Sequence, residues 1–191
     1  MKNTRFFTLI EVLAAIAIIA LLSIIGYGSY SYATNAAKNA RTQALFKNLE
    51  AGLENLSGKV GYYPGSAGGA FSPIVVTLGS DKTVNRISFG GTVIEDSDDP
   101  VKKAQFDAFV KGVDLEQLKQ NRDNNGRLID AWGGVIAYRA PSTFTGSYDL
   151  LSAGPDGTFS SDNASDPNTV TDLGKYHDAD GNPLCDDLFN F

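Results

Sequence analysis

The sequence predicts an α+β protein in which one long N-terminal α-helix packs on a small antiparallel β-sheet. Three observations support this fold class. An apolar run from residue 7 to about residue 25 continues into a proline-free stretch rich in helix-forming residues, which is typical of a long helix. Leu45, Leu49, Leu53 and Leu56 recur at helical spacing along one face. Short alternating segments bounded by glycine-rich turns follow in the second half of the chain and indicate strands.

Composition narrows the range of functions. The chain has 191 residues, enough for one domain of ordinary size plus an anchor. Its net charge is -6 and it has no basic cluster, which argues against nucleic acid as a partner, since affinity for nucleic acid depends on neutralising phosphates. Cys185 is the only cysteine and His177 the only histidine. An intrachain disulfide is therefore excluded, and so are most catalytic and metal sites built on histidine or cysteine.

The first 28 residues have the pattern of a membrane anchor that contains one acid. Residues 1–6 carry Lys2 and Arg5 and no acid, which predicts that this end stays in the cytoplasm and that the remainder lies outside the inner membrane. Residues 7–28 are long enough to cross a bilayer. Glu11 lies near the start of this run. A carboxylate placed at the bilayer centre costs at least ~2.5 kcal/mol. Such a carboxylate is a candidate functional group that requires a positive partner.

A secretory signal peptide is the alternative interpretation of this N-terminus, because it has the same basic start. The nearest small-x-small cleavage site is Gly26-Tyr27-Gly28, at the end of the apolar run. The carboxylate of Glu11 inside the run speaks against a plain signal peptide.

The segment Phe-Thr-Leu-Ile-Glu at residues 7–11, between a short basic leader and an apolar helix, resembles the N-terminus of type IV pilins and pseudopilins. The resemblance implies that a prepilin peptidase cuts between Phe6 and Phe7 and that the new amine is methylated. It also implies that Glu11 neutralises the amine of a neighbouring subunit when helices pack in a filament. The family has Gly or Ala before the cut, whereas this chain has Phe6, so either the peptidase accepts Phe6 or the chain stays uncut.

The long helix is expected to continue through an amphipathic half at residues 29–58 and to end near Gly58, Gly61 and Pro64. The globular domain then covers residues 59–191. Its first part is expected to contain short strands near 74–78 and 87–89, followed by helical spacing over 102–120.

The second half of the domain contains a turn-and-strand pattern. Asp130-Ala131-Trp132-Gly133 precedes an alternating strand, a Tyr-Asp-Leu strand follows at residues 147–152, and a tight turn occupies residues 153–157. We expect Trp132 to lie in the core. This pattern is similar to the C-terminal half of the major pseudopilin of the type II secretion system, with Gly134-Val135 in place of the usual Asn-Pro.

The region at residues 152–172 is a candidate calcium loop. Calcium prefers six to eight oxygen ligands from carboxylates, amides and backbone carbonyls, and the spacing of acids here suits such a cage. The alternative is a solvated acidic turn. The resemblance strengthens the calcium interpretation, because family members bind calcium in this loop. The candidate ligands are the carbonyl of Ala153 together with Asp156, Asp162, Asn163 and Asp166.

The sequence therefore favours a non-enzymatic, single-pass inner-membrane subunit that polymerises into a periplasmic pseudopilus driving type II secretion. The resemblance implies several partners: copies of itself, the prepilin peptidase, the inner-membrane assembly platform, minor pseudopilins and the membrane. The alternative is a type IV pilin of a surface pilus that serves adhesion, motility or DNA uptake. A third class, an enzyme or solute-binding protein on a signal anchor, is disfavoured because no nucleophile or paired-carboxylate motif is present.

Overall fold

The computed structural model describes residues 8–142, 144, 146–159, 164–169 and 188–190; the side chains of residues 25–29 are left out of the description. The chain forms two units, Met1–Ala37 and Lys38–Phe191, which are described separately. The helices are α1 (Leu9–Val60), α2 (Pro100–Val110) and α3 (Leu115–Gln120), with short 3-10 turns η1 (Ala67–Gly69) and η2 (Pro167–Thr169). The strands are β1 (Ser72–Pro73), β2 (Val75–Leu78), β3 (Val84–Ser88), β4 (Val93–Glu95), β5 (Ala137–Arg139), β6 (Asp149–Ser152) and β7 (Leu188–Phe189).

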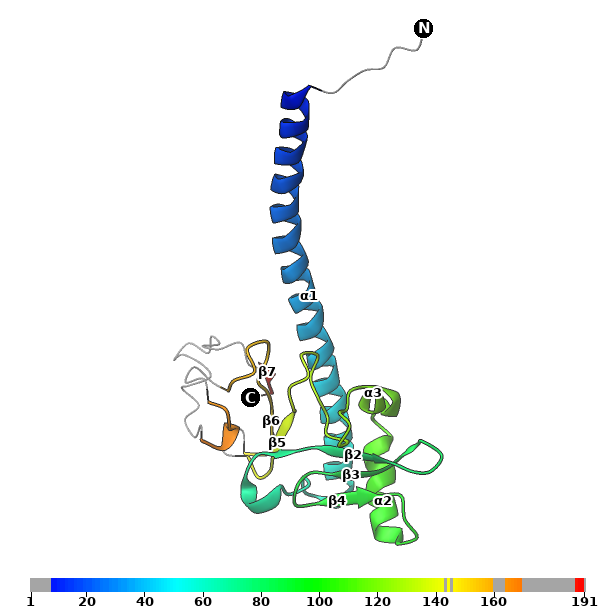
Figure 1. The fold of residues 1–191 in the computed structure, drawn as a ribbon. Coiled ribbons are helices and arrows are strands. Elements are labelled where there is room, and N and C mark those ends of the chain that lie inside the picture. Colours follow the sequence, from blue (N-terminus) through cyan, green and yellow to red (C-terminus); the bar gives the residue numbers. More distant parts are fainter. Residues whose placement is uncertain (1–7, 143, 145, 160–163, 170–187, 191) are drawn as a thin grey trace. The chain divides into compact units, whose positions relative to one another are not determined.

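The first unit is helical from Leu9 onward and belongs to the 52-residue helix α1 (Figure 1). Its apolar residues lack β-strand alternation, and the described hydroxyl side chains of Ser23 and Thr34 bond to backbone carbonyls of the same helix. The hydroxyl of Ser23, for example, donates to the carbonyl of Ile19 at 2.8 Å. Such back-bonding satisfies a polar side chain in an apolar segment without help from another element.

The second unit has its own hydrophobic core, to which the later turns of α1 contribute. Leu45, Leu49, Leu53 and Leu56 are at most 2% exposed and belong to one cluster with residues of both sheets. The predicted amphipathic face is therefore confirmed. The helix ends at Val60, where Gly61 adopts a φ of +84° and its N–H bonds the carbonyl of Ser57 at 2.7 Å. Glycine reaches this left-handed conformation without the steric cost that other residues pay.

Two antiparallel sheets complete the second unit. One has the order β1-β5-β6-β7 and the other the order β2-β3-β4. Pro73 lies in β1, at an edge of the larger sheet, where a residue without an N–H group is tolerated. The predicted α+β class with a long N-terminal helix and antiparallel strands is confirmed; strands β1, β4 and β7 were not predicted.

The two short helices start with the capping chemistry that their sequences provide. Asp99 accepts hydrogen bonds from Val101 N–H and Lys102 N–H, and Pro100 occupies the first turn of α2. Asp114 caps α3 in the same way. Helix α2 packs on β4 and buries Phe109 completely. These contacts place the smaller sheet beside α2 (Figure 1).

Candidate assembly site

The first turn of α1 is built around a hydrogen-bonded pair, Thr8 and Glu11. Glu11 Oε2 accepts a bond from the backbone N–H of Thr8 at 2.8 Å and another from the Thr8 hydroxyl at 2.8 Å. In return the N–H of Glu11 donates to Thr8 Oγ1 at 3.3 Å. This reciprocal arrangement is a capping box, in which two free N–H groups of a helix start are satisfied by side chains.

The capping box gives Glu11 a role that sequence reasoning missed. The signal was present in the sequence, because Thr-x-x-Glu before an apolar run is the pattern of a capping box. Both bonds use Oε2 of Glu11, and no described residue donates a hydrogen bond to Oε1. One carboxylate oxygen thus holds the helix start, while the other is available to a donor outside the described chain.

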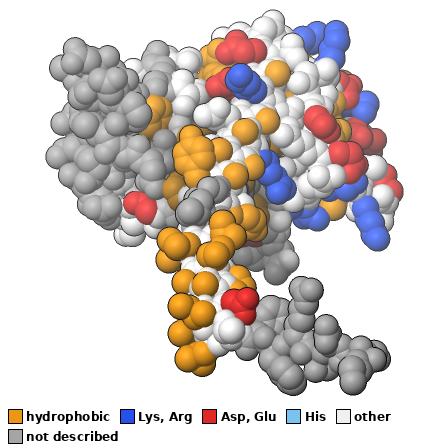
Figure 2. All heavy atoms as spheres, turned by 90° about the horizontal axis from the view of Figure 1, so that it is seen from above, with side chains coloured by type: hydrophobic (Ala, Val, Ile, Leu, Met, Phe, Trp, Pro, Cys, Tyr) orange, Lys and Arg blue, Asp and Glu red, His pale blue; other side chains and the backbone are white. Residues whose placement is uncertain are grey.

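Apolar side chains along the first unit are exposed to an unusual degree. Leu9 is 81% exposed and Ile24 is 73% exposed, and the large apolar side chains described between them are also exposed. In Figure 2, hydrophobic side chains gather over the N-terminal part of α1. Exposed apolar surface on this scale marks a protein or membrane contact. Among the residues that the structure describes, no helix reaches the length and apolarity needed for a bilayer crossing.

The predicted processing residues Phe6 and Phe7 lie outside the described residues, so only Glu11 of the predicted N-terminal site has a described geometry. The structure therefore does not test cleavage between Phe6 and Phe7, which stays a prediction.

The predicted calcium loop is described only in part, since Asp162 and Asn163 lie outside the description. Asp156 accepts bonds from both the N–H and the hydroxyl of Thr158, each at 2.8 Å. Asp166 accepts from the N–H of Asn168 at 2.9 Å. Within the described part of the chain, no three acidic, histidine or cysteine side chains lie together as metal ligands. The described residues alone therefore do not form a calcium site, and calcium binding stays a prediction.

Asp130 organises the turn that the sequence pattern singled out. Its Oδ1 accepts bonds from the N–H groups of Trp132 and Gly134, both at 2.8 Å, and its Oδ2 accepts from the Ser152 hydroxyl at 2.6 Å. A Cβ at Gly134 would lie 2.8 Å from Oδ2 of Asp130, so a larger residue here would require the Asp130 carboxylate to shift. The turn is thereby attached to β6.

The prediction that Trp132 lies in the core is wrong. The residue is only partly buried, and it belongs to neither hydrophobic cluster. The physical reason is the Asp130 turn, which holds the backbone N–H of Trp132 directly before the exposed Gly133.

Residues 1–27 match the prokaryotic N-terminal methylation motif. No curated protein and no solved structure matches the chain. The matched range includes Phe6, Phe7 and Glu11, so the predicted pilin-like N-terminus with a prepilin signal is confirmed in general form. The motif indicates prepilin-type processing and a membrane-anchored, pilin-like protein; it does not distinguish a pseudopilin from a pilin.

Proposed function

We propose that this chain is a structural subunit that is cut before Phe7, methylated at the new amine, and assembled into a filament through the N-terminal part of α1. The observation that carries the proposal is the conjunction of an exposed apolar helix with a single carboxylate, Glu11, at its start. An apolar helix alone would need only lipid, whereas a carboxylate there also needs a cation.

The capping box supports separate roles for the two carboxylate oxygens of Glu11. Its Oε2 holds Thr8 and thereby completes the helix start, which leaves Oε1 for the amine of a neighbouring copy. A charge-assisted bond of this kind is shorter and stronger than a neutral one and offsets the desolvation of both groups. The pair therefore fixes the register between helices that are otherwise uniformly apolar.

Before assembly, the chain would be held in the inner membrane as a single-pass protein, with residues 1–6 in the cytoplasm and the second unit in the periplasm. Lys2 and Arg5 support this orientation, since positive residues before an apolar segment are retained on the cytoplasmic side. The peptidase, the assembly platform and minor pseudopilins would be its partners.

Within this class we favour the major pseudopilin of type II secretion over a pilin of a surface pilus. The support is the Asp130-x-Trp132-Gly133 turn with the Tyr-Asp-Leu strand that follows it, a pattern similar to that family. A deletion strain discriminates the two functions. Exoproteins that accumulate in the periplasm indicate the pseudopilus, whereas loss of surface fibres with normal secretion indicates the surface pilus.

Three substitutions test the assembly mechanism by separating the cap from the charge. Glu11→Gln keeps an acceptor oxygen for Thr8 but removes the charge, Glu11→Val removes both, and Thr8→Val removes the hydroxyl of the capping box while leaving the charge. We expect Glu11→Gln and Glu11→Val to reach the membrane without forming filaments, because neither can neutralise an amine. Thr8→Val should assemble with reduced efficiency. Electron microscopy of sheared filaments and membrane fractionation give the two readouts.

Filaments of normal length from Glu11→Gln would show that hydrogen bonding at the helix start suffices and would refute the charge pairing. Loss of membrane localisation in all three variants would instead show that they fail before assembly, and a milder Glu11→Asp variant would then replace them.

We further propose that the loop at residues 152–172 binds calcium, with Asp156, Asp162, Asn163, Asp166 and the Ala153 carbonyl as ligands. The support is chemical: these are hard oxygen donors of the kind that calcium takes, in a chain that has no intrachain disulfide to stabilise it. Binding would require Asp156 to exchange its bonds with Thr158 for the ion. We expect a chelator to lower the melting temperature of the full chain in detergent, and calcium but not magnesium to restore it. An unchanged melting temperature would remove calcium from the account.

A further inference from the structure

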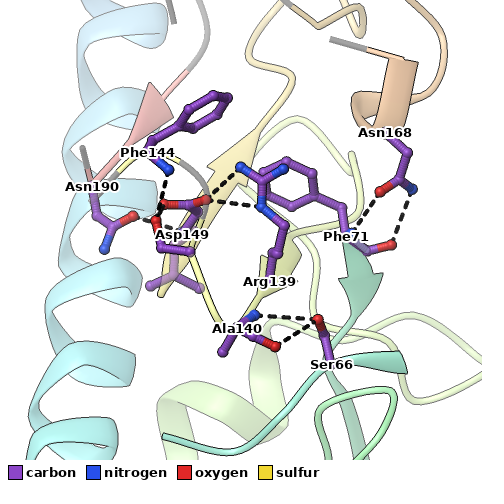
Figure 3. A network of polar contacts seen from close by, with 10 residues as sticks. Ser66, Phe71, Arg139, Ala140, Phe144, Asp149, Asn168 and Asn190 are labelled. Atoms are coloured by element: carbon purple, nitrogen blue, oxygen red, sulfur yellow. Dashed lines mark hydrogen bonds and ion pairs between the residues drawn. The ribbon is translucent and has the colours of Figure 1, made fainter. Parts of the chain in front are cut away.

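The C-terminal segment at residues 170–187 carries five aspartates and one lysine, Lys175. The segment itself lies outside the described residues, but the residues directly before and after it are described. Each of these flanking stretches is attached to the four-stranded sheet by an asparagine side chain (Figure 3).

Asn168, in η2, binds the backbone of Phe71 at two points. Its Oδ1 accepts from the N–H of Phe71 at 2.6 Å, and its Nδ2 donates to the carbonyl of Phe71 at 3.2 Å. The amide group thus offers one donor and one acceptor to a single residue, as a paired strand does. Asp166 orients this amide by accepting from its Nδ2 at 3.0 Å. Phe71 directly precedes β1, an edge strand of the sheet.

Asn190 repeats the arrangement at the other edge. Its side-chain Oδ1 accepts from the N–H of Leu150 at 2.6 Å, and its own N–H donates to the carbonyl of Leu150 at 3.3 Å. Leu150 lies in β6, the strand that pairs with β7. The bonds of Asn190 therefore extend the β6–β7 pairing beyond the end of β7.

A buried ion pair connects the two attachment points. Arg139 contacts the ring of Phe71, with its guanidinium carbon 4.1 Å from the ring centroid, and pairs with Asp149 at 2.9 and 2.5 Å. Asp149 is the residue before Leu150, and its side chain is fully buried. The residue held by Asn168 and the residue held by Asn190 are thus joined through Arg139 and Asp149, all within the second unit (Figure 3).

We propose that Asn168 and Asn190 are paired anchors that hold the two ends of the acidic C-terminal segment on opposite edges of the four-stranded sheet. They do by side-chain-to-backbone hydrogen bonds what a disulfide would do, and Cys185 has no second cysteine in the chain with which to form one. The inference concerns the second unit alone and stands whether or not the chain assembles into filaments.

Lys175 provides the test, because it is the one trypsin site inside the segment. Cleavage of the full chain in detergent is followed by mass spectrometry at Lys175, with the exposed turn residue Lys82 as an internal reference. Asn168→Ala and Asn190→Ala should each raise the rate of cleavage at Lys175 about fivefold or more relative to that at Lys82, since each variant loses one or two net hydrogen bonds that hold an end of the segment. Asn124→Ala is the matched control, as the Asn124 side chain is exposed and has no hydrogen bond to a described residue.

Amide hydrogen exchange separates the two anchors. Asn168→Ala should accelerate exchange in the peptide that contains Phe71 and leave that of Leu150 near its wild-type rate, and Asn190→Ala should do the reverse. If both variants keep the wild-type cleavage ratio and exchange rates, the anchors do not hold the segment and the proposal is wrong. If exchange rises across the whole unit in both variants, the asparagines stabilise the fold in general, and the specific anchoring role is equally refuted.

Discussion

Arg139 and Asp149 form a buried ion pair between β5 and β6 of the larger sheet. Their side chains are 6% and 0% exposed, and the guanidinium lies between the rings of Phe71 and Phe144. A planar, weakly hydrated cation suits this stacked position, in which Nε and Nη2 of Arg139 both donate to Oδ2 of Asp149, and lysine cannot reproduce it. The pair therefore fixes how β5, β6 and the flanking loops meet.

Replacing one partner of this ion pair should lower the free energy of unfolding more than expected from the effect of replacing both. We expect Arg139→Leu alone and Asp149→Leu alone each to lower the free energy of unfolding by about 3–5 kcal/mol, because each leaves a buried charge without its partner. The double variant should lose clearly less than the sum of the two. Urea unfolding followed by Trp132 fluorescence measures all three. Additive losses would mean that the two charges do not interact.

The buried hydroxyl of Tyr138 should make the folded state less stable at alkaline pH. Burial raises the pKa of its hydroxyl well above the usual value near 10, and the hydroxyl donates to the Pro64 carbonyl at 2.7 Å. The folded state therefore keeps the proton when the unfolded state begins to release it, and stability should be fully present below pH ~10 and decline above it.

Tyr138→Phe removes the titrating group and should flatten this decline, at the cost of a lower stability at neutral pH. Tyr62→Phe is the control, since the side chain of Tyr62 is 54% exposed. Urea midpoints between pH 8 and pH 11 give the comparison. Equal slopes for wild type and Tyr138→Phe would contradict the assignment.

At the scale of elements, two glycines of α1 are predicted to respond in opposite directions to the same substitution. A Cβ at Gly52 would lie 2.4 Å from Val113 and 2.7 Å from Phe109, whereas a Cβ at Gly58 would meet nothing within 4 Å. Gly52→Ala should therefore destabilise by about 1–3 kcal/mol through overpacking, and Gly58→Ala should stabilise by about 0.5–1 kcal/mol through helix propensity. Melting temperatures of the two variants check this; stabilisation by both would mean that α2 does not pack closely on α1.

The elements that could be predicted from the sequence are those whose pattern is contained in neighbouring residues. The leucine face of α1 was predicted because helical spacing is written in consecutive turns, and the N-terminal motif because its five residues are contiguous. Strand β4 was missed because three residues carry too little alternation, and its pairing with β3 is a tertiary contact. Trp132 was misplaced because its position depends on the Asp130 turn.

The candidate site was predictable to a similar extent. Glu11 was identified from its unusual place in an apolar run, and its bonds with Thr8 follow from a spacing that was overlooked. The Asn168 and Asn190 anchors join residues 97 and 40 positions apart in the sequence, so no local pattern reveals them.

The two units of the molecule differ in the burial of their described apolar side chains. Those of the first unit that are large and described are exposed, whereas the second unit buries apolar residues in two clusters. We expect a chain that starts at Lys38 to fold cooperatively and to stay monomeric without detergent, because the exposed apolar helix is removed and the core is retained. Light scattering and circular dichroism test this. A truncated chain that is unfolded or aggregated would show that the second unit needs the first.

The central claim is that the chain carries a processed and methylated prepilin-type N-terminus from which assembly follows. The most direct test is the intact mass and N-terminal peptide mass of the protein isolated from membranes of cells that contain the peptidase. The account predicts a chain that begins at Phe7 and carries one additional methyl group on its amine. A chain that retains Met1–Phe6, or one that begins after Gly28 as a cleaved signal peptide would leave it, would contradict the account.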